Sequence, residues 1–143
     1  MAPRRGLAMA KTLKKIAFDP AVFLATVNGG RAKSNYRPGT IIFSQGNPAD
    51  EVFYIHKGKV KIVVTSEHGK EAVVAVLGAG EFFGEGCLIA QPLRLATATA
   101  LSECMVMQVE KAEMIRVLHA EPAFAELFTA HLLTRNRDRK SVV

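Results

Sequence analysis

The sequence predicts a mainly β domain of the jelly-roll kind, with helices at both ends. Between residues 35 and 110, short runs rich in Val, Ile, Phe and Thr alternate with turns that contain glycine or proline. Close spacing of this kind is typical of an antiparallel sandwich or barrel, and about eight such runs match the strand number of a jelly roll. After residue 110, apolar residues recur at the spacing of a helix.

Length and composition place the chain among single-domain globular proteins. It has 143 residues, of which 49% are hydrophobic and 22% charged, so it can bury a core and is not disordered. No run approaches the ~18 apolar residues of a membrane span, and the basic N-terminus lacks the apolar segment of a secretory signal. Cys87 and Cys104 are too few for a disulfide scaffold. We expect a cytoplasmic protein that makes no membrane contact.

The positive charge is concentrated at the two ends of the chain. Residues 1–15 contribute +5 and residues 135–143 contribute +3 to a net charge of +6, which leaves −2 for the body between them. A folded DNA-binding face needs clustered Lys and Arg on a structured element, and the body offers none. Weak contact between the basic ends and nucleic acid stays open as an alternative.

The first residues predict a lead-in followed by a helix. Residues 1–18 are a basic, flexible lead-in, and Asp19-Pro20 has the N-cap and first-turn residues of a helix, which Asn28-Gly29-Gly30 ends. We expect one domain over residues 19–135 and a basic tail over 136–143.

The β region then follows in a regular series of strands and turns. Lys59 and Lys61 alternate with Val60 and Ile62, which predicts one exposed and one buried strand face, and Gly58 supplies a positive φ in the turn before them. The predicted strands include 40–43, 52–56, 59–64, 71–77, 95–101 and 105–109.

Two helices complete the predicted domain. The first covers Lys111 to Ala120, and the second begins at Glu121-Pro122. Its apolar residues recur at helical spacing and predict packing against the barrel. These residues are Phe124, Leu127, Phe128, His131 and Leu132. His131 is expected to be a partly buried, hydrogen-bonded histidine rather than a ligand.

Residues 80–98 carry the strongest functional signal. They predict a strand end, a glycine turn, one turn of helix, a proline-marked loop and a new strand that opens with Arg94. Gly84 and Gly86 allow close backbone approach, and the amides that begin a helix favour a phosphate. Arg94 can add a forked pair of hydrogen bonds. Glu85 would repel the anion, so its natural partner is a hydroxyl such as a ribose 2′-OH. Together these residues predict a sugar-phosphate pocket, although each charge alone could be an ordinary structural one.

This stretch resembles the phosphate-binding cassette of cyclic-nucleotide-binding domains. The similarity consists of Phe83-Gly84-Glu85, a spacing of nine residues to Arg94, and Ala96-Thr97. It is most similar to the effector domain of Crp/Fnr-type transcription regulators and extends roughly from Asp19 to Arg135. The resemblance implies a β-roll in which Glu85 binds the ribose 2′-OH and Arg94 the cyclic phosphate. The candidate ligand-binding residues are Phe83, Gly84, Glu85, Gly86, Cys87, Leu88, Arg94, Leu95, Ala96 and Thr97.

The function expected from this resemblance is ligand sensing in signal transduction, without catalysis. The ligand is cAMP ahead of cGMP, because Leu95 lacks the hydroxyl shared by cGMP-preferring relatives, and no other cofactor or metal is expected. Ligand binding would shift the last helix, which forms the dimer interface in relatives and here offers Phe128, Leu132 and Leu133. We expect no helix-turn-helix in this chain.

Two further alternatives remain open at this point. In the first, Leu95 and Gly86 spoil the cassette, and the domain is an orphan β-roll that serves dimerisation or another interaction. In the second, the barrel is a cupin-type enzyme. This alternative requires a metal triad, but His56, His68, His119 and His131 are isolated in the sequence.

Overall fold

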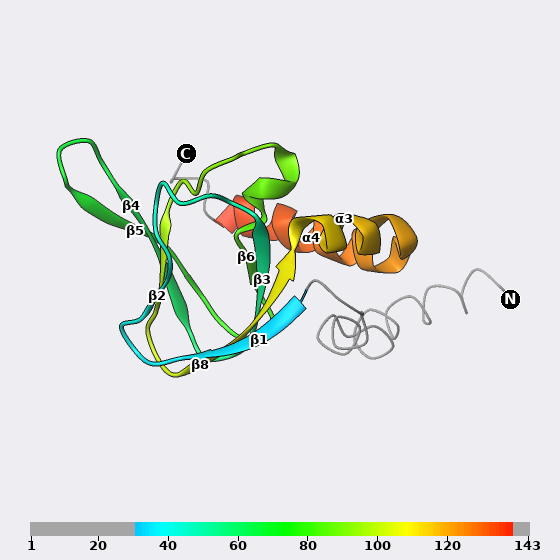
Figure 1. Ribbon diagram of the computed structural model, residues 1–143, viewed down its shortest axis with the longest axis horizontal. Coiled ribbons are helices and arrows are strands. Elements are labelled where there is room, and N and C mark those ends of the chain that lie inside the picture. Colours follow the sequence, from blue (N-terminus) through cyan, green and yellow to red (C-terminus); the bar gives the residue numbers. More distant parts are fainter. Residues whose placement is uncertain (1–30, 139–143) are drawn as a thin grey trace, which may run out of the picture.

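The computed structural model describes residues 31–138, with side chains described over 33–134. The predicted lead-in, the helix expected from Asp19 and the last residues of the tail lie outside the described range. Within it, the chain forms two antiparallel four-stranded sheets and two α-helices (Figure 1). The expected mainly β, jelly-roll architecture is confirmed.

The strands are divided equally between the sheets. Sheet A has the order β1-β8-β3-β6 and sheet B the order β2-β7-β4-β5. The strands of sheet A are β1 (Arg31–Tyr36), β3 (Glu51–Lys57), β6 (Phe82–Phe83) and β8 (Cys104–Glu110). Those of sheet B are β2 (Ile41–Phe43), β4 (Val60–Thr65), β5 (Glu71–Leu77) and β7 (Thr97–Ala100).

Strand β1 begins earlier than the sequence indicated. It pairs with β8 from Arg31↔Val109 to Tyr36↔Cys104, whereas the β region was expected from Asn35. The sequence of β1 is mostly polar because the strand lies at the edge of sheet A and has a neighbour on one side only. An edge strand of this kind carries little of the apolar pattern by which strands are recognised.

Sheet A is covered on both faces, which explains the continuous apolar run in β3. Val52 and Tyr54 face the helices, and Phe53 and Ile55 face sheet B, because successive side chains of a strand point to opposite sides. Figure 1 shows the helices on one side of sheet A and sheet B on the other. Sheet B is covered on one face only, and most of β5 is exposed or half-buried.

The turn between β3 and β4 requires a glycine, as predicted. Gly58 has a φ of +96°, and a Cβ at this position would lie 2.7 Å from Cys104 Sγ. Any side chain would therefore be strained by its backbone conformation and would collide with the start of β8. The alternation in β4 is also as predicted, since Val60 and Ile62 are buried in the core between the sheets.

Helices α3 (Lys111–Ala120) and α4 (Pro122–Asp138) pack on the outer face of sheet A. Met114, Val117 and Phe124 are fully buried there. Helix α4 continues three residues beyond the expected domain end at 135. None of the helices within residues 31–138 combines the length and apolar character that crossing a membrane requires.

The apolar stripe of α4 serves mainly the core. Phe128 is 5% exposed and meets the ring of Phe82 at a right angle, with centroids 5.0 Å apart. The expectation that Phe128 belongs to a dimer interface is therefore wrong, because the side chain is already buried within the chain. Leu132 packs partly against the same cluster, whereas Leu133 is 65% exposed. His131 is partly buried, and its Nε2 accepts a hydrogen bond from the Phe82 N–H, as its sequence position indicated.

Candidate functional site

The predicted cassette folds around a short 3-10 helix that contacts strand β3 and helix α3. Strand β6 ends at Phe83, Gly84 adopts a φ of +77°, and helix η2 spans Glu85–Ile89. Ala90 has a φ of 68°, which ends the helix and turns the chain back. The sequence correctly predicted this order of strand end, glycine turn and helical turn.

The backbone on either side of Arg94 is held firmly to the loop before β3. The Arg94 N–H donates to Asn47 O at 2.8 Å, and the Arg94 carbonyl accepts from the Gly46 N–H at 2.8 Å. Ala49 N–H donates to Pro92 O at 2.9 Å, beside a bridge between Pro48 and Leu93. The position of Arg94 is therefore fixed by the fold before any ligand is present.

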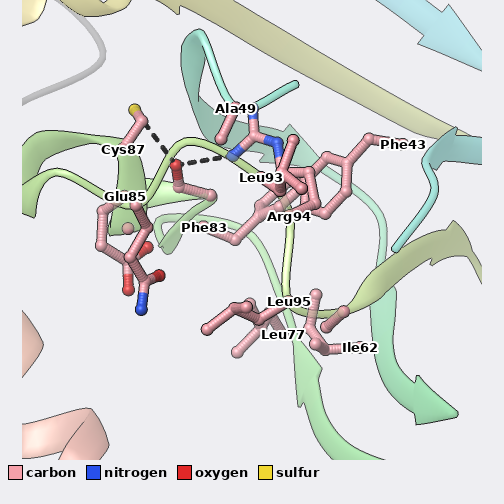
Figure 2. Close-up of a pocket in the computed structure, with 14 residues that line it drawn as sticks. Phe43, Ala49, Ile62, Leu77, Phe83, Glu85, Cys87, Leu93, Arg94 and Leu95 are labelled. Carbon is pink, nitrogen blue, oxygen red and sulfur yellow. Dashed lines mark hydrogen bonds between the residues drawn. The ribbon is translucent and has the colours of Figure 1, made fainter. Parts of the chain in front are cut away.

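The Arg94 side chain joins two segments that are far apart in the sequence. Its Nη1 donates to the Gly84 carbonyl at 2.8 Å (Figure 2). Its Nη2 donates to the Glu51 carbonyl at 2.7 Å. A Cβ on Gly84 would lie 2.9 Å from Nη1 and 2.9 Å from Phe53 Cδ1. Gly84 is thus required both for its backbone conformation and for the approach of the guanidinium.

Three aromatic rings form a platform for this guanidinium. Phe53 and Phe83 are stacked with centroids 4.9 Å apart, and Phe43 lies 5.4 Å from Phe53. The Arg94 Cζ atom is 4.2 Å from the centroid of Phe43 and 5.4 Å from that of Phe53. Stacking over an aromatic face stabilises a cation, and more so where water is excluded.

Arg94 is nevertheless a buried cation that forms no ion pair with the described residues. Its exposure is 6%, and among residues 33–134 it is the only charged side chain that is buried. The one ion pair within that range joins Arg116 and Glu113 on the surface of α3. Arg94 Nε is buried and has no hydrogen-bond partner among the described residues. Burial lowers the pKa of this guanidinium from its usual value, although nearby acidic groups oppose the shift.

A pocket opens beside this arginine, with a volume of about 210 Å³. This is smaller than the ~300–1,000 Å³ of pockets that enclose whole ligands, so it can surround the sugar-phosphate part of a nucleotide rather than all of it. Most of the predicted site residues line it, namely Phe83, Gly84, Glu85, Gly86, Cys87, Arg94, Leu95 and Ala96.

Two predicted site residues lie outside the pocket. Leu88 packs against the core between sheet A and the helices, because its position in η2 directs it inward. Thr97 Oγ1 accepts a hydrogen bond from the Gln45 N–H at 2.9 Å and therefore links the turn after β2 to the start of β7. Neither residue is part of the pocket lining, and their inclusion in the ligand-binding set stays a prediction.

Glu85, Cys87 and Leu95 differ in what they offer to the pocket. Figure 2 shows Glu85 and the Arg94 guanidinium on different sides of the cavity, and Leu95 close to Leu77 and Ile62 in the view, away from the guanidinium. The position of Leu95 argues against the alternative in which this side chain spoils the cassette by crowding a phosphate bound by Arg94. Cys87 is buried, and burial raises the pKa of its thiol, while the charge of Arg94 opposes the shift.

The sequence did not identify several residues of the pocket wall. Ile62, Leu77 and Phe43 come from sheet B, where the strand pattern placed them in a core rather than at a site. Gln91 also lines the pocket, and no motif distinguished it from other loop residues. The described residues contain no group of three or more His, Cys, Asp or Glu side chains that could hold a metal ion.

Comparison with known proteins identifies the class to which this fold and site belong. Residues 33–121 match the family described as "Cyclic nucleotide-binding domain". This match covers well over half of the chain, and the chain therefore belongs to the family. The expected resemblance is confirmed, and relatives of the Crp type are among the matches.

Individual relatives show the same relation in more detail. The chain is 30% identical over 103 residues to the cyclic AMP receptor protein of Thermus thermophilus, which covers 72% of this chain and 48% of that protein. The crystal structure of the Thermus thermophilus catabolite activator protein matches with a TM-score of 0.72 and 28% identity, over 87% of this chain and 58% of that one.

A third match concerns the fold alone. The c-di-GMP-responsive global regulator CLP of Xanthomonas campestris has a TM-score of 0.74 at 23% identity, over 83% of this chain and 58% of that one. The present chain thus spans about half the length of the regulators it matches. It carries a cyclic nucleotide-binding domain of the Crp/Fnr type.

Proposed function

We propose that this chain is a sensor of cyclic nucleotides, with cAMP as its ligand, and that it acts without catalysis. The observation that carries the proposal is the buried guanidinium of Arg94, which faces a pocket and has no ion-pair partner among the described residues. A buried charge is strongly unfavourable unless it is paired, and an anionic ligand would supply the missing charge. The similarity to a cyclic AMP receptor protein favours cAMP over other cyclic nucleotides.

Arg94 can bind a phosphate without leaving its structural partners. A guanidinium carries more N–H donors than its bonds to Gly84 and Glu51 use, and the unpartnered Nε belongs to this remainder. Glu85 would accept the hydrogen bond of the ribose 2′-OH on another side of the pocket. An orphan β-roll becomes the better description only if this pocket takes no cyclic nucleotide.

Strand β6 offers a route from the pocket to helix α4. Phe83 lies in the pocket wall and stacks on Phe53 beneath the guanidinium. Its neighbour Phe82 points to the other face of sheet A, where it contacts Phe124 and Phe128. A ligand that shifts β6 would therefore change the preferred placement of α4. In a longer protein this movement would reach a transcription-regulating partner or domain.

Calorimetric titration of the whole chain tests the ligand assignment. We expect cAMP to bind with micromolar or tighter affinity, and cGMP to bind more weakly. Adenosine, which lacks the cyclic phosphate, should give heats no larger than dilution, because Arg94 would have no anion to pair with. Absence of binding by both cyclic nucleotides, in a chain that unfolds cooperatively, would contradict the proposal and support the orphan β-roll.

The proposal includes assembly through the end of α4 and a cytoplasmic location. Leu133 is exposed on α4, so a dimer would use this end of the helix rather than the buried Phe128. Light scattering should give twice the chain mass for the wild type and a single mass for Leu133→Asp. A single mass for both would contradict the proposed dimer.

The free thiols of Cys87 and Cys104 support the proposed cytoplasmic location, because free thiols fit a reducing compartment.

A further inference from the structure

The side chain of Gln91 is polar and lines the pocket, but its carboxamide makes no hydrogen bond to the rest of the described fold. It follows Ala90, whose left-handed conformation reverses the chain so that the Gln91 N–H donates to Gly86 O at 3.3 Å. The side chain lines the same pocket as Glu85 and Arg94. Within residues 33–134 its carboxamide makes no hydrogen bond, whereas that of Gln45, for example, binds the backbone of Thr65.

Gly86 is what allows Gln91 to occupy this place. A Cβ on Gly86 would collide with Gln91 Oε1 and would lie 3.4 Å from its Cδ. The backbone of Gly86 has no positive φ, so the absence of a side chain matters here for space rather than for conformation. Any larger residue at position 86 would displace the flexible carboxamide of Gln91 from its place beside Gly86.

The chemistry of a hydroxyl group explains why Glu85 and Gln91 together would bind a sugar hydroxyl better than Glu85 alone. A hydroxyl group donates one hydrogen bond and accepts others, whereas an ionised carboxylate only accepts. Glu85 alone can therefore satisfy the proton of a sugar hydroxyl but leaves its oxygen without a donor. The carboxamide of Gln91 has N–H donors, and it lies against the residue next to Glu85.

We propose that Gln91 is a specificity-determining residue that donates a hydrogen bond to the ribose 2′ oxygen, while the same hydroxyl donates to Glu85. This inference rests on the proposed function, because it assumes a cyclic nucleotide in the pocket. It assigns to Gly86 the task of making room for the carboxamide. Gly86 thus serves recognition of the ligand rather than spoiling the cassette.

The test compares cAMP with 2′-deoxy-cAMP in calorimetric titrations of the whole chain. Gln91→Leu keeps the approximate size of the side chain but removes its donor, so cAMP affinity should fall roughly three- to tenfold, as for one neutral hydrogen bond. Affinity for 2′-deoxy-cAMP, which lacks the oxygen, should change less than about twofold. Equal weakening of both ligands, or none for either, would overturn the inference.

A second pair of variants tests the role of Gly86. Gly86→Ala should lower cAMP affinity in the wild-type background, because its methyl group displaces the carboxamide. The same change should have no further effect in a Gln91→Ala background, where no carboxamide remains to be displaced. Equal losses in both backgrounds would overturn the coupling of Gly86 to Gln91. If the wild type binds cAMP while these variants bind it equally well, only the inference fails; if the wild type binds no cAMP, the proposed function fails with it.

Discussion

Two walls of the pocket differ in how firmly their side chains are bonded to the rest of the fold. The arginine wall consists of Arg94 with Phe43 and Gly84, and the loop wall consists of Glu85, Gly86 and Gln91. Arg94 is buried, stacked on Phe43 and hydrogen-bonded to two backbone carbonyls. Gln91 is half-buried and makes no side-chain hydrogen bond within residues 33–134. The arginine wall is part of the fold, whereas Gln91 in the loop wall is held mainly by its backbone.

This difference predicts which substitutions change ligand affinity alone and which also change the free energy of unfolding. A substitution in the arginine wall removes interactions that also hold β3, β6 and the cassette together. A substitution at Gln91 removes only what the side chain would offer to a ligand. Loss of binding in an Arg94 variant is therefore weak evidence for a ligand contact unless stability is measured on the same protein.

The largest effect is expected for Arg94→Ala. The change leaves the carbonyls of Gly84 and Glu51 with only the weak thiol donor of Cys87, and the lost hydrogen bonds to a charged group contribute about 1.5–3 kcal/mol each. Urea unfolding should show a loss of about 3 kcal/mol or more in the free energy of unfolding. Affinity for cAMP should fall about a hundredfold or more. A variant as stable as the wild type would show that the arginine wall does not support the fold.

An intermediate effect is expected for Glu85→Gln in the loop wall. The amide oxygen can still accept from the ribose hydroxyl, but the bond is no longer charge-assisted, so cAMP affinity should fall roughly tenfold. The free energy of unfolding should change much less than in Arg94→Ala. Calorimetric titration and urea unfolding of the same preparations measure both quantities. A loss of stability equal to that of Arg94→Ala would erase the distinction between the two walls.

The smallest effect is expected for Leu95→Ala. Leu95 is 62% exposed, so the free energy of unfolding should stay within about 0.5 kcal/mol of the wild type. Because Leu95 lies apart from the guanidinium, cAMP affinity should change less than about threefold. An increase in affinity of more than about tenfold would show instead that Leu95 crowds the phosphate.

Much of the fold could be predicted because local patterns and tertiary structure agree. The strand alternation of Val60 and Ile62, the turn at Gly58 and the boundaries of α3 all follow from short stretches of sequence. Strand β1 was missed before Asn35 because an edge strand needs little apolar sequence. Phe128 was correctly predicted to pack in the core, but it was also assigned to a dimer interface, because helical periodicity shows that a face is apolar but not what covers it.

The candidate site was predicted in its charges but not in its packing. The spacing of Glu85 and Arg94 indicated the pocket, yet nothing local shows that Arg94 would also bind the carbonyl of Glu51, which is distant in the sequence. Gln91 reaches the pocket only because Ala90 reverses the chain and Gly86 leaves space. Such contacts depend on backbone conformation that the residue types do not specify.

The most direct test of the dual role of Arg94 is urea unfolding of the wild type and Arg94→Lys, each with and without cAMP. An ammonium retains the charge but cannot span both carbonyls while stacking on Phe43, so the variant should be less stable without ligand. At a concentration about 100 times its dissociation constant, cAMP should raise the wild-type free energy of unfolding by about 2.7 kcal/mol, and the variant should gain less at that concentration. A variant that is as stable as the wild type and gains as much from cAMP would contradict the account.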